Sequence, residues 1–281
     1  MSLVSSASVY NLPAENSRII GDITNHKVIK GDYFQTIAET YNVGYLALLA
    51  ANSGVDPFLP ELGVNLVIPK QMLLPYGKRE GIVINLAELR LYYYPKGEHL
   101  VYVFPVGIGR QGLETPNLTS IIGDKRKDPI WRPTKQMRER YFSEHGKEMA
   151  REIAAGPSNP FGKYALRIDT SEYLLHGTNK RFGIGMRASS GCIRLYDNDI
   201  EWLYNNVPEG TPIRILNQPI KMSYEQDGKK IELHSPLTPD NGSKAELEIT
   251  RAVENFIGND ESMIEQVKLL LDKPQGIVVS L

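Results

Sequence analysis

The strongest constraint on the fold is a succession of strand-like runs in the middle of the chain. Apolar, β-branched and aromatic residues fill 82–86, 89–94 and 100–106. The last two runs, LRLYYY and LVYVFPV, flank the turn-forming sequence Pro-Lys-Gly-Glu at 95–98. We therefore predict an antiparallel hairpin here, within a mainly β domain.

A long irregular stretch interrupts these strands. Residues 113–163 are rich in Pro and Gly, with one predicted helix near 137–155 that His145-Gly146 breaks. Such an insertion in a compact β domain is typical of a lid or a binding loop. Regular patterns resume after it, with strands at 164–168, 173–176 and 210–216 and a helix at 198–206.

The chain before the β region has another pattern. Within 26–70, a β-branched run at 27–30 precedes a Gly-Asp turn, and two stretches then carry apolar residues at helical spacing. Leu66-Val67-Ile68 reads as a closing strand that Pro69 stops. This order, β-α-α-β, makes a small α+β unit. The Pro- and Gly-containing segment 71–79 joins it to the β region.

The end of the chain reads as a small α/β region. A charged hairpin with Asp227-Gly228 as its turn is followed by amphipathic helices near 244–257 and 262–271. Its role is not predicted. The expected division of the chain is an N-terminal segment, the α+β unit, the β domain and the C-terminal region, at 1–25, 26–70, 79–217 and 218–281.

Composition excludes several classes of function. The net charge is -1, which gives no general attraction for nucleic acid or an anionic membrane. No apolar run approaches the roughly 20 residues that span a bilayer. The chain has one cysteine and five scattered histidines, so we expect no internal disulfide and no zinc site.

The single cysteine has a sequence context that suits a nucleophile. Cys192 follows Gly191, which lets a substrate approach the backbone closely. His176 lies sixteen residues earlier, where the apolar run EYLLH ends in the loop sequence GTN. If strand and loop are neighbours, His176 can accept the thiol proton. The alternative is a buried structural cysteine and a hydrogen-bonded histidine, and the spacing alone leaves both open.

Sequence motifs around these two residues favour the interpretation that they are catalytic. HGT at 176–178 and SSGCIRL at 189–195 resemble the signature of the L,D-transpeptidases, the YkuD-like family. The similarity extends upstream through FPVGIGR, ETP, DPIWRPT and GPSNPFGKYALRI, and covers about 80–217. It implies a mainly β catalytic domain, a YkuD-like β-sandwich with a helical insertion.

The resemblance also implies roles for individual residues. Cys192 corresponds to the nucleophile and His176 to its base. The carbonyl of Gly177 would orient the imidazole, with Ser189 nearby. The amides of Gly191 and Cys192 are the predicted donors to the oxyanion.

Four further residues are predicted to meet the substrate. Arg194 stands at the family's Asn/Arg position, where it would hold the loop or the substrate. Ser190 replaces the family's usual His before Gly-Cys; its hydroxyl can donate a hydrogen bond but carries no charge. We therefore expect retained chemistry with altered orientation or substrate contacts. Trp131 and Phe161 would line the acyl-donor groove, the alternative being ordinary core packing.

The α+β unit resembles a LysM module, a peptidoglycan-binding domain. The similarity lies in VIKGDYFQTIAETYNV and LLAANSGVDPFLPELGVNLVIP. By this resemblance Gly31, Asp32 and Tyr33 in one loop and Asp56 in another would bind sugar. Tyr33 is the best of them for stacking on a sugar face, whereas Phe34 is expected in the core.

The chain as a whole resembles the Gram-negative ErfK/YbiS-like branch of the family. That branch implies a Cys thioester at the third residue of a peptidoglycan stem peptide, transferred to an amine of another stem or of an outer-membrane lipoprotein. No metal or organic cofactor is needed, since the thioester divides the transfer into two steps. The implied compartment is the periplasm, although the sequence as given begins without an intact signal peptide.

Two alternatives to this function stay open. An L,D-carboxypeptidase would use the same nucleophile and base, with water as the acceptor. A non-catalytic peptidoglycan-binding protein would keep the α+β unit as an anchor for a degenerate domain, a reading that Ser190 supports.

Overall fold

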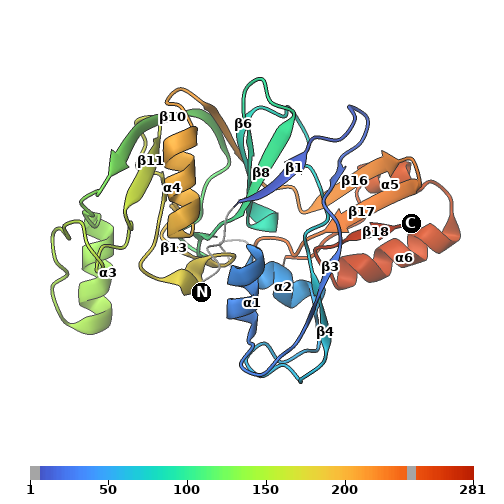
Figure 1. The fold of residues 1–281 in the computed structure, drawn as a ribbon, viewed down its shortest axis with the longest axis horizontal. Coiled ribbons are helices and arrows are strands. Elements are labelled where there is room, and N and C mark those ends of the chain that lie inside the picture. Colours follow the sequence, from blue (N-terminus) through green and yellow to red (C-terminus); the bar gives the residue numbers. More distant parts are fainter. Residues whose placement is uncertain (1–6, 239–244) are drawn as a thin grey trace.

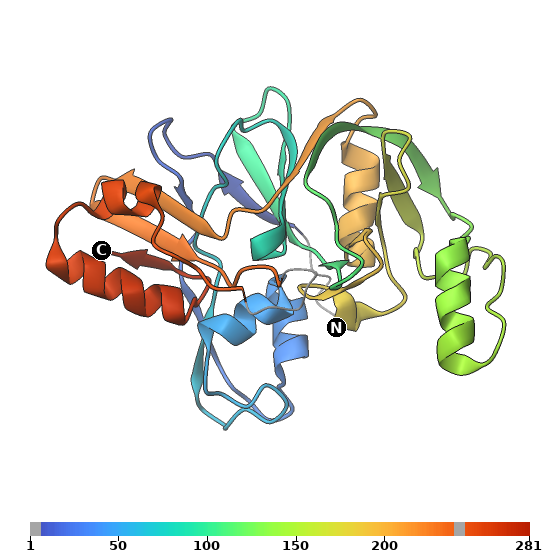
Figure 2. The same cartoon turned by 180° about the vertical axis from the view of Figure 1, so that it is seen from behind.

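The computed structural model describes residues 7–238 and 245–281. A curved sheet occupies the centre, the α+β unit lies on one side of it and the C-terminal region at one end (Figure 1). Seen from behind, the insertion helix stands away from the body at the opposite end from the C-terminal region (Figure 2). Within the described residues, no helix is both long and apolar enough to cross a membrane.

Nine strands of the described chain form the central sheet. Their order is β1-β8-β7-β6-β15-β10-β11-β12-β14. Their bounds are β1 Ser8–Asn11, β6 Gly81–Asn85, β7 Arg90–Tyr94, β8 Leu100–Pro105, β10 Leu118–Lys127, β11 Tyr164–Ile168, β12 Leu174–His176, β14 Ile193–Arg194 and β15 Pro212–Leu216. The predicted hairpin is confirmed, because β7 and β8 pair antiparallel.

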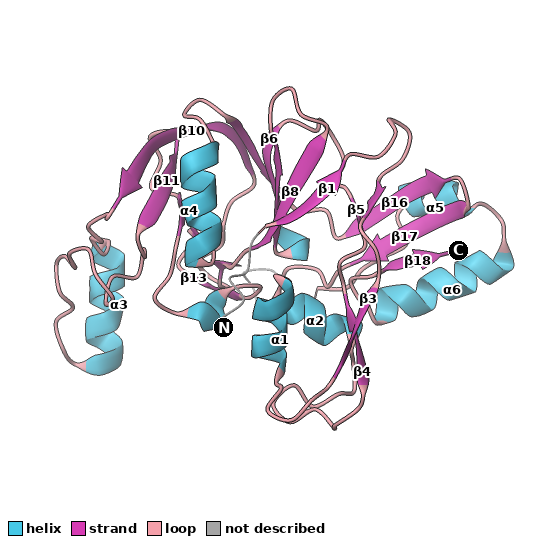
Figure 3. Ribbon diagram, in the orientation of Figure 1, coloured by secondary structure: helices cyan, strands magenta, loops and turns pink. Residues whose placement is uncertain are grey.

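The expected two-sheet sandwich is instead one curled sheet (Figure 3). The long strand β10 makes the bend. Its first residues pair with β15, whereas its later residues pair with β11. The register with β11 shifts between Ile122 and Lys125, an irregularity of the kind that bends a strand and increases its twist. One continuous sheet can therefore enclose a core that two separate sheets were expected to cover.

A helix fills the inside of the curl. The helix α4, Asp197–Asn206, packs on β11 and β12 (Figure 1). Its fully buried Ile200 and Leu203 belong to the main apolar cluster together with Leu166 and Ile193 of the sheet. Apolar residues three apart on one helical face produce this contact.

The α+β unit has the predicted order of elements. It consists of β3 Thr24–Lys27, α1 Phe34–Tyr41, α2 Tyr45–Ala51 and β4 Asn65–Ile68. The first strand, β3, ends at Lys27, the residue at which the predicted strand 27–30 begins. Phe34 is fully buried with Leu48 and Leu66, as expected for its core. The short strands β2, Ile19–Ile20, and β5, Met72–Leu73, pair beside the unit.

The insertion holds a shorter helix than predicted. The helix α3, Lys135–His145, ends at Gly146, which takes the left-handed conformation with φ 63°. The expected continuation to residue 155 is wrong, because the chain beyond Gly146 turns back and Ile153 forms a β-bridge with Trp131. The remaining short elements of this domain are η1 Leu86–Glu88, β9 Ile108–Gly109, η2 Arg181–Gly183 and β13 Arg187–Ser189.

The C-terminal region is a three-stranded sheet covered by two helices. Its elements are β16 Ile220–Glu225, β17 Gly228–Leu233, α5 Arg251–Ile257, α6 Glu261–Asp272 and β18 Val278–Ser280. The hairpin turn is Gln226-Asp227, since Gly228 already pairs with Glu225. Helix α5 begins later than predicted because Thr250 caps it by accepting from the amide of Val253. Residue 244, the predicted start, lies outside the described residues.

A buried cluster of ions joins this region to the central sheet. The Lys221 ammonium lies 2.9 Å from Glu88 and 2.8 Å from Glu232, and the Arg90 guanidinium lies 3.0 and 2.8 Å from the same carboxylates. His234 also contacts Glu232, at 2.8 Å. Burial acts to raise the pKa of both carboxyls, but the surrounding cations offset it, so both pKa values lie below the ordinary range.

Replacing Lys221 with Met should strongly destabilise the protein. The change leaves two buried carboxylates with fewer cations, and we expect the free energy of unfolding to fall by about 3–5 kcal/mol. Urea unfolding at neutral pH measures it. The matched control is Lys268→Met on the exposed surface of α6, which should stay within about 0.5 kcal/mol of the wild type. Equal losses of unfolding free energy in the two variants would contradict the role of Lys221 in neutralising the buried carboxylates.

A second buried acid lies where the α+β unit meets α4. Asp199 is 1% exposed, and burial raises its pKa to about 8, although the neighbouring side chain of Asn42 opposes the shift. The folded state therefore binds this proton more tightly than the unfolded chain. The resulting stability is present below about pH 4 and is lost as the pH rises towards 8.

Asp199→Asn should remove this pH dependence. Relative to the wild type, the variant should gain up to about 4 kcal/mol of unfolding free energy between pH 5 and pH 8, because the buried side chain no longer ionises. Urea unfolding of both proteins at the two pH values measures the difference. A stability difference that is the same at both pH values would show that Asp199 does not titrate in this range.

Candidate active site

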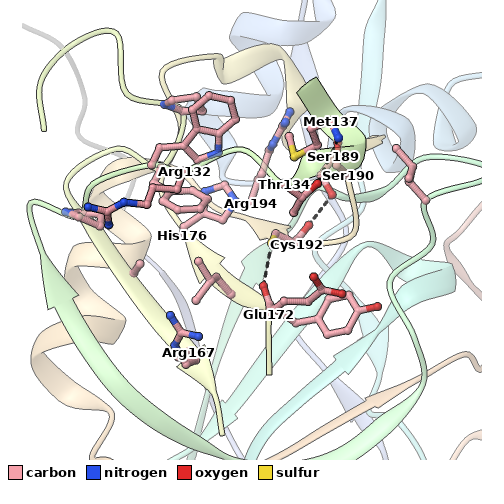
Figure 4. A pocket seen from close by; sticks show the side chains of 18 of the residues that line it. Arg132, Thr134, Met137, Arg167, Glu172, His176, Ser189, Ser190, Cys192 and Arg194 are labelled. Atoms are coloured by element: carbon pink, nitrogen blue, oxygen red, sulfur yellow. Dashed lines mark hydrogen bonds between the residues drawn. The ribbon is translucent and has the colours of Figure 1, made fainter. Parts of the chain in front are cut away.

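Two neighbouring parallel strands place His176 and Cys192 on one face of the sheet. Leu175 of β12 pairs with Ile193 of β14, and His176 pairs with Arg194. Because side chains alternate along a strand, Cys192 shares the face of Arg194 and therefore that of His176. Both side chains line a cavity of about 760 Å³ (Figure 4).

His176 is held as a neutral imidazole. It is 3% exposed, and its Nδ1 lies 2.5 Å from the carbonyl oxygen of Gly177. A carbonyl only accepts, so the proton is on Nδ1 and Nε2 is left as an acceptor. Burial lowers the pKa of His176 to about 3, with a smaller effect from Arg194 in the same direction. The ring of Phe161 lies against the imidazole, 4.7 Å between centroids.

The Cys192 thiol is half-buried and also neutral. Its sulfur donates to the carbonyl oxygen of Glu172 at 3.9 Å. Burial raises the pKa of the thiol, although the backbone at Leu174 and the charge of Arg194 oppose the shift. The site at rest therefore pairs a neutral thiol with a neutral base.

Polar contacts fix the loop that carries Cys192. Ser189 Oγ donates to the carbonyl of Cys192 at 2.5 Å and accepts from the amide of Gly191 at 3.1 Å. Thr115 Oγ1 donates to the carbonyl of Gly191 at 2.8 Å and accepts from the amide of Gly109 at 3.0 Å. Gly191 has φ +104°, in the region that disfavours side chains.

One hydrogen bond involves a predicted oxyanion donor. The amide of Gly191 donates to Ser189 Oγ in this structure. The amide of Cys192 is the other predicted donor.

The four predicted substrate-binding residues all line the cavity. The backbone of Arg194 exchanges two 2.8 Å hydrogen bonds with Gly107, which leaves its guanidinium toward the cavity. Ser190 is exposed, and Trp131 is a buried part of the wall. Phe161 lines the cavity and also supports His176, a second contact that the sequence did not predict.

The charge around the cavity favours an anionic ligand. Among its described lining residues, six basic side chains outnumber three acidic ones; these are Arg126, Arg132, Lys135, Arg140, Arg167 and Arg194 against Glu114, Asp124 and Glu172. Asp124 is already paired with Arg126 at 2.6 Å and Arg167 at 2.9 Å. Arg132, Lys135 and Arg140 pair with Glu152, Glu139 and Glu144 at the surface. Among the guanidinium groups of the wall, that of Arg194 has no ion pair with a described acid, and a carboxylate is its natural partner.

Sequence reasoning missed two residues beside the nucleophile. Thr115 is 5% exposed and bonds the loop at Gly191; its only signal was its place in the ETP motif. Glu172, which accepts from the sulfur through its backbone, had no signal in the sequence. Both contacts join segments far apart in the chain.

The predicted sugar-binding acids have local structural roles. Asp32 accepts from the amide of Ile29 at 2.9 Å and lies 2.7 Å from His26 Nε2. Asp56 accepts from the amide of Phe58 at 2.9 Å, which closes a turn. Their carboxylates therefore shape the two loops.

The surface of these loops is apolar. Tyr33 is 38% exposed, and Phe58 and Leu59 are each 79% exposed. Gly31 has φ +94°, and a Cβ at this position would have no neighbouring atom within 4 Å. The loops lie at the tip of the α+β unit that points away from the catalytic sheet (Figure 1).

Comparison with known proteins identifies the family of this chain. A family model described as the L,D-transpeptidase catalytic domain, YkuD, matches residues 79–215. A second, the L,D-transpeptidase C-terminal domain, matches residues 219–281.

Three curated relatives match nearly the whole chain. The probable L,D-transpeptidase YcfS of Escherichia coli K12 is 44% identical, over 99% of this chain and 90% of the relative. Probable L,D-transpeptidase ErfK/SrfK of Salmonella typhimurium is 41% identical, over 97% and 90%. Probable L,D-transpeptidase YbiS of E. coli K12 is 41% identical, over 94% and 88%. The chain therefore belongs to the L,D-transpeptidase family of peptidoglycan enzymes.

Proposed function

We propose that this chain is a cysteine-dependent L,D-transpeptidase that acts on peptidoglycan stem peptides. The observation that carries the proposal is the shared face of β12 and β14, where a half-buried thiol and a neutral imidazole line one cavity. A neutral base beside a neutral thiol can take its proton as the sulfur attacks a carbonyl.

The reaction proceeds in two halves. Cys192 Sγ attacks the carbonyl carbon of the third stem residue while His176 Nε2 takes the thiol proton. The amide of Cys192 donates to the oxyanion. The C–N bond then breaks, and D-alanine leaves with the proton from His176, so that a thioester remains. An acceptor amine attacks this thioester and forms a C–N bond while His176 takes the amine proton. The C–S bond then breaks, and His176 returns the proton to the sulfur to restore the thiol.

The basic wall of the cavity supports a stem peptide as the donor. Stem peptides carry free carboxylates, which Arg194 beside the sulfur and Arg132 near α3 can bind. Helix α3 has no buried residue and contributes Lys135 and Arg140 to the same wall. We infer that the insertion is the lid over the donor.

The acceptor is proposed to be an amine, from a second stem peptide or from a lysine of an outer-membrane lipoprotein. The exposed Glu172 next to the sulfur supports an amine over water, because it can attract a protonated amine into the site. The α+β unit is proposed to act as a LysM module that binds glycan through Tyr33 and its apolar neighbours. The proposed compartment is the periplasm.

A tetrapeptide donor should distinguish transfer from hydrolysis. With an amine acceptor we expect cross-linked product and free D-alanine; without it, little tripeptide. Cys192→Ala should abolish both reactions, and His176→Gln should slow them by about 10²–10⁴-fold, because the general base is lost. Mass spectrometry of the products measures each yield. Tripeptide formed at the same rate with and without the amine would make the enzyme a carboxypeptidase.

A carbapenem should acylate the protein at its only cysteine. The strained β-lactam carbonyl is an electrophile for the activated thiol, so intact mass should rise by one carbapenem per chain. Cys192→Ala, if folded, should show no adduct, and peptide mapping should place the adduct on Cys192. Absence of an adduct in folded wild-type protein would favour a non-catalytic wall-binding protein.

A further inference from the structure

We propose that the α+β unit, 24–68, is a positioning element of the active site. It holds in place the two segments that carry His176 and Cys192. The proposal rests on the proposed cysteine mechanism. Residues 177–189 connect His176 to the loop that carries Cys192. The α+β unit contacts this segment at Gly185 and also contacts helix α4. A unit that served only as a tethered anchor would need neither contact.

The first contact joins two backbones. The amide of Leu46 in α2 donates to the carbonyl of Gly185 at 3.1 Å, and the amide of Gly185 donates to Val106 of the catalytic domain at 3.2 Å. A Cβ at Gly185 would overlap Gly44 and Tyr45 of the α+β unit. Gly185, with φ +70°, is therefore enclosed between the start of α2 and the end of the β7–β8 hairpin.

This contact leads directly to Cys192. Strand β13 begins two residues after Gly185 and pairs with β9. It ends at Ser189, whose carbonyl accepts from Arg110 at 3.0 Å and whose hydroxyl bonds the loop at Gly191 and Cys192. A displacement of Gly185 would move β13 and the hydroxyl that holds the nucleophile loop.

The second contact lies between α1 and the first turn of α4. Asn42 lies beside the buried carboxyl of Asp199, and Gln35 lies beside the hydroxyl of Tyr196. Glu39 lies 3.8 Å from Arg181 in the connecting segment itself. The face of α1 that makes these contacts packs against the catalytic domain, while the loops at the tip stay exposed.

This second contact leads to His176. Asp197, in the same turn of α4, accepts from the amide of Thr178 at 3.2 Å. Asp197 is packed so closely on Gly177 that any side chain there would overlap it. The carbonyl of Gly177 is the group that fixes the imidazole through Nδ1. The α+β unit thus supports the base through α4 and the nucleophile through β13.

The consequence is that events at the α+β unit reach the chemistry. Reacting groups lose much of their rate when displaced by about 1 Å, even by a change far from the chemistry. Glycan bound at the exposed tip of the α+β unit would therefore affect a unit that contacts the segments of both His176 and Cys192.

The test is Gly44→Val, a change confined to the α+β unit. Gly44 has φ -69° and ψ 141°, which any residue can adopt, so the unit itself should still fold. A Cβ there would lie 3.2 Å from the Cα of Gly185, so the added bulk must push the catalytic segment away. The matched control is Thr40→Val on the exposed side of α1, where the hydroxyl donates to the carbonyl of Thr36.

Two readouts separate positioning from general stability. The rate of iodoacetamide alkylation across pH reports the thiol pKa of the only cysteine, and tetrapeptide turnover gives kcat and KM. In Gly44→Val we expect kcat to fall about tenfold with KM within about twofold, together with a shifted alkylation profile. Thr40→Val should match the wild type in both.

Other outcomes have definite meanings. Wild-type kcat and an unchanged alkylation profile in folded Gly44→Val would overturn the proposal. If that variant does not fold, Gly44→Ala requires a shift of only a few tenths of an ångström and should give a smaller loss of the same kind. If the wild type neither turns over nor forms a carbapenem adduct, the proposed function fails, whereas the alkylation profiles still test the coupling.

Discussion

The structure depends on the short parallel pairing of β12 with β14. Two paired positions place the imidazole of His176 and the sulfur of Cys192 on one face of the sheet. A strand of only two residues cannot hold such a register by itself, and hydrogen bonds on both sides supply the rest. Gly107 pairs with Arg194 beyond the sulfur, and Ser189 closes the loop before it. The edge of the sheet therefore sets the relative position of the proposed catalytic groups.

Burial sets the chemical state of both groups. It raises the pKa of the Cys192 thiol and lowers that of the His176 imidazole to about 3, so neither carries charge at neutral pH. A resting thiolate–imidazolium pair would be expensive in this environment. In the proposed reaction, charge develops only as the sulfur attacks, when the oxyanion and the protonated imidazole form together. Arg194 is placed to stabilise negative charge near the sulfur and to disfavour a protonated imidazole before the reaction begins.

Both flanking regions are joined to the catalytic sheet by polar contacts in buried places. Lys221 and Arg90 neutralise Glu88 and Glu232 where the C-terminal hairpin meets the sheet, and the ammonium of Lys221 also donates to the carbonyl of Leu73 in β5. Lys221 belongs to the C-terminal region and Leu73 follows the α+β unit, so one ammonium group links the segments that flank the catalytic domain. The contacts of the α+β unit with Gly185 and α4 add to this junction.

The sequence by itself determined the local structure and the reactive residue types. Apolar and aromatic runs on either side of the turn 95–98 predicted the β7–β8 hairpin, and helical spacing predicted α1, α2 and α4. The motifs predicted a cysteine nucleophile with His176 as its base. Only the tertiary structure decided that β10 bends one sheet instead of joining two, that no helix follows Gly146 in the insertion, and that the Gly191 amide is bonded to Ser189. Local patterns specify backbone conformation and which face is apolar. Burial, and with it the charge of His176 and Cys192, arises from segments distant in the chain, which no local pattern records.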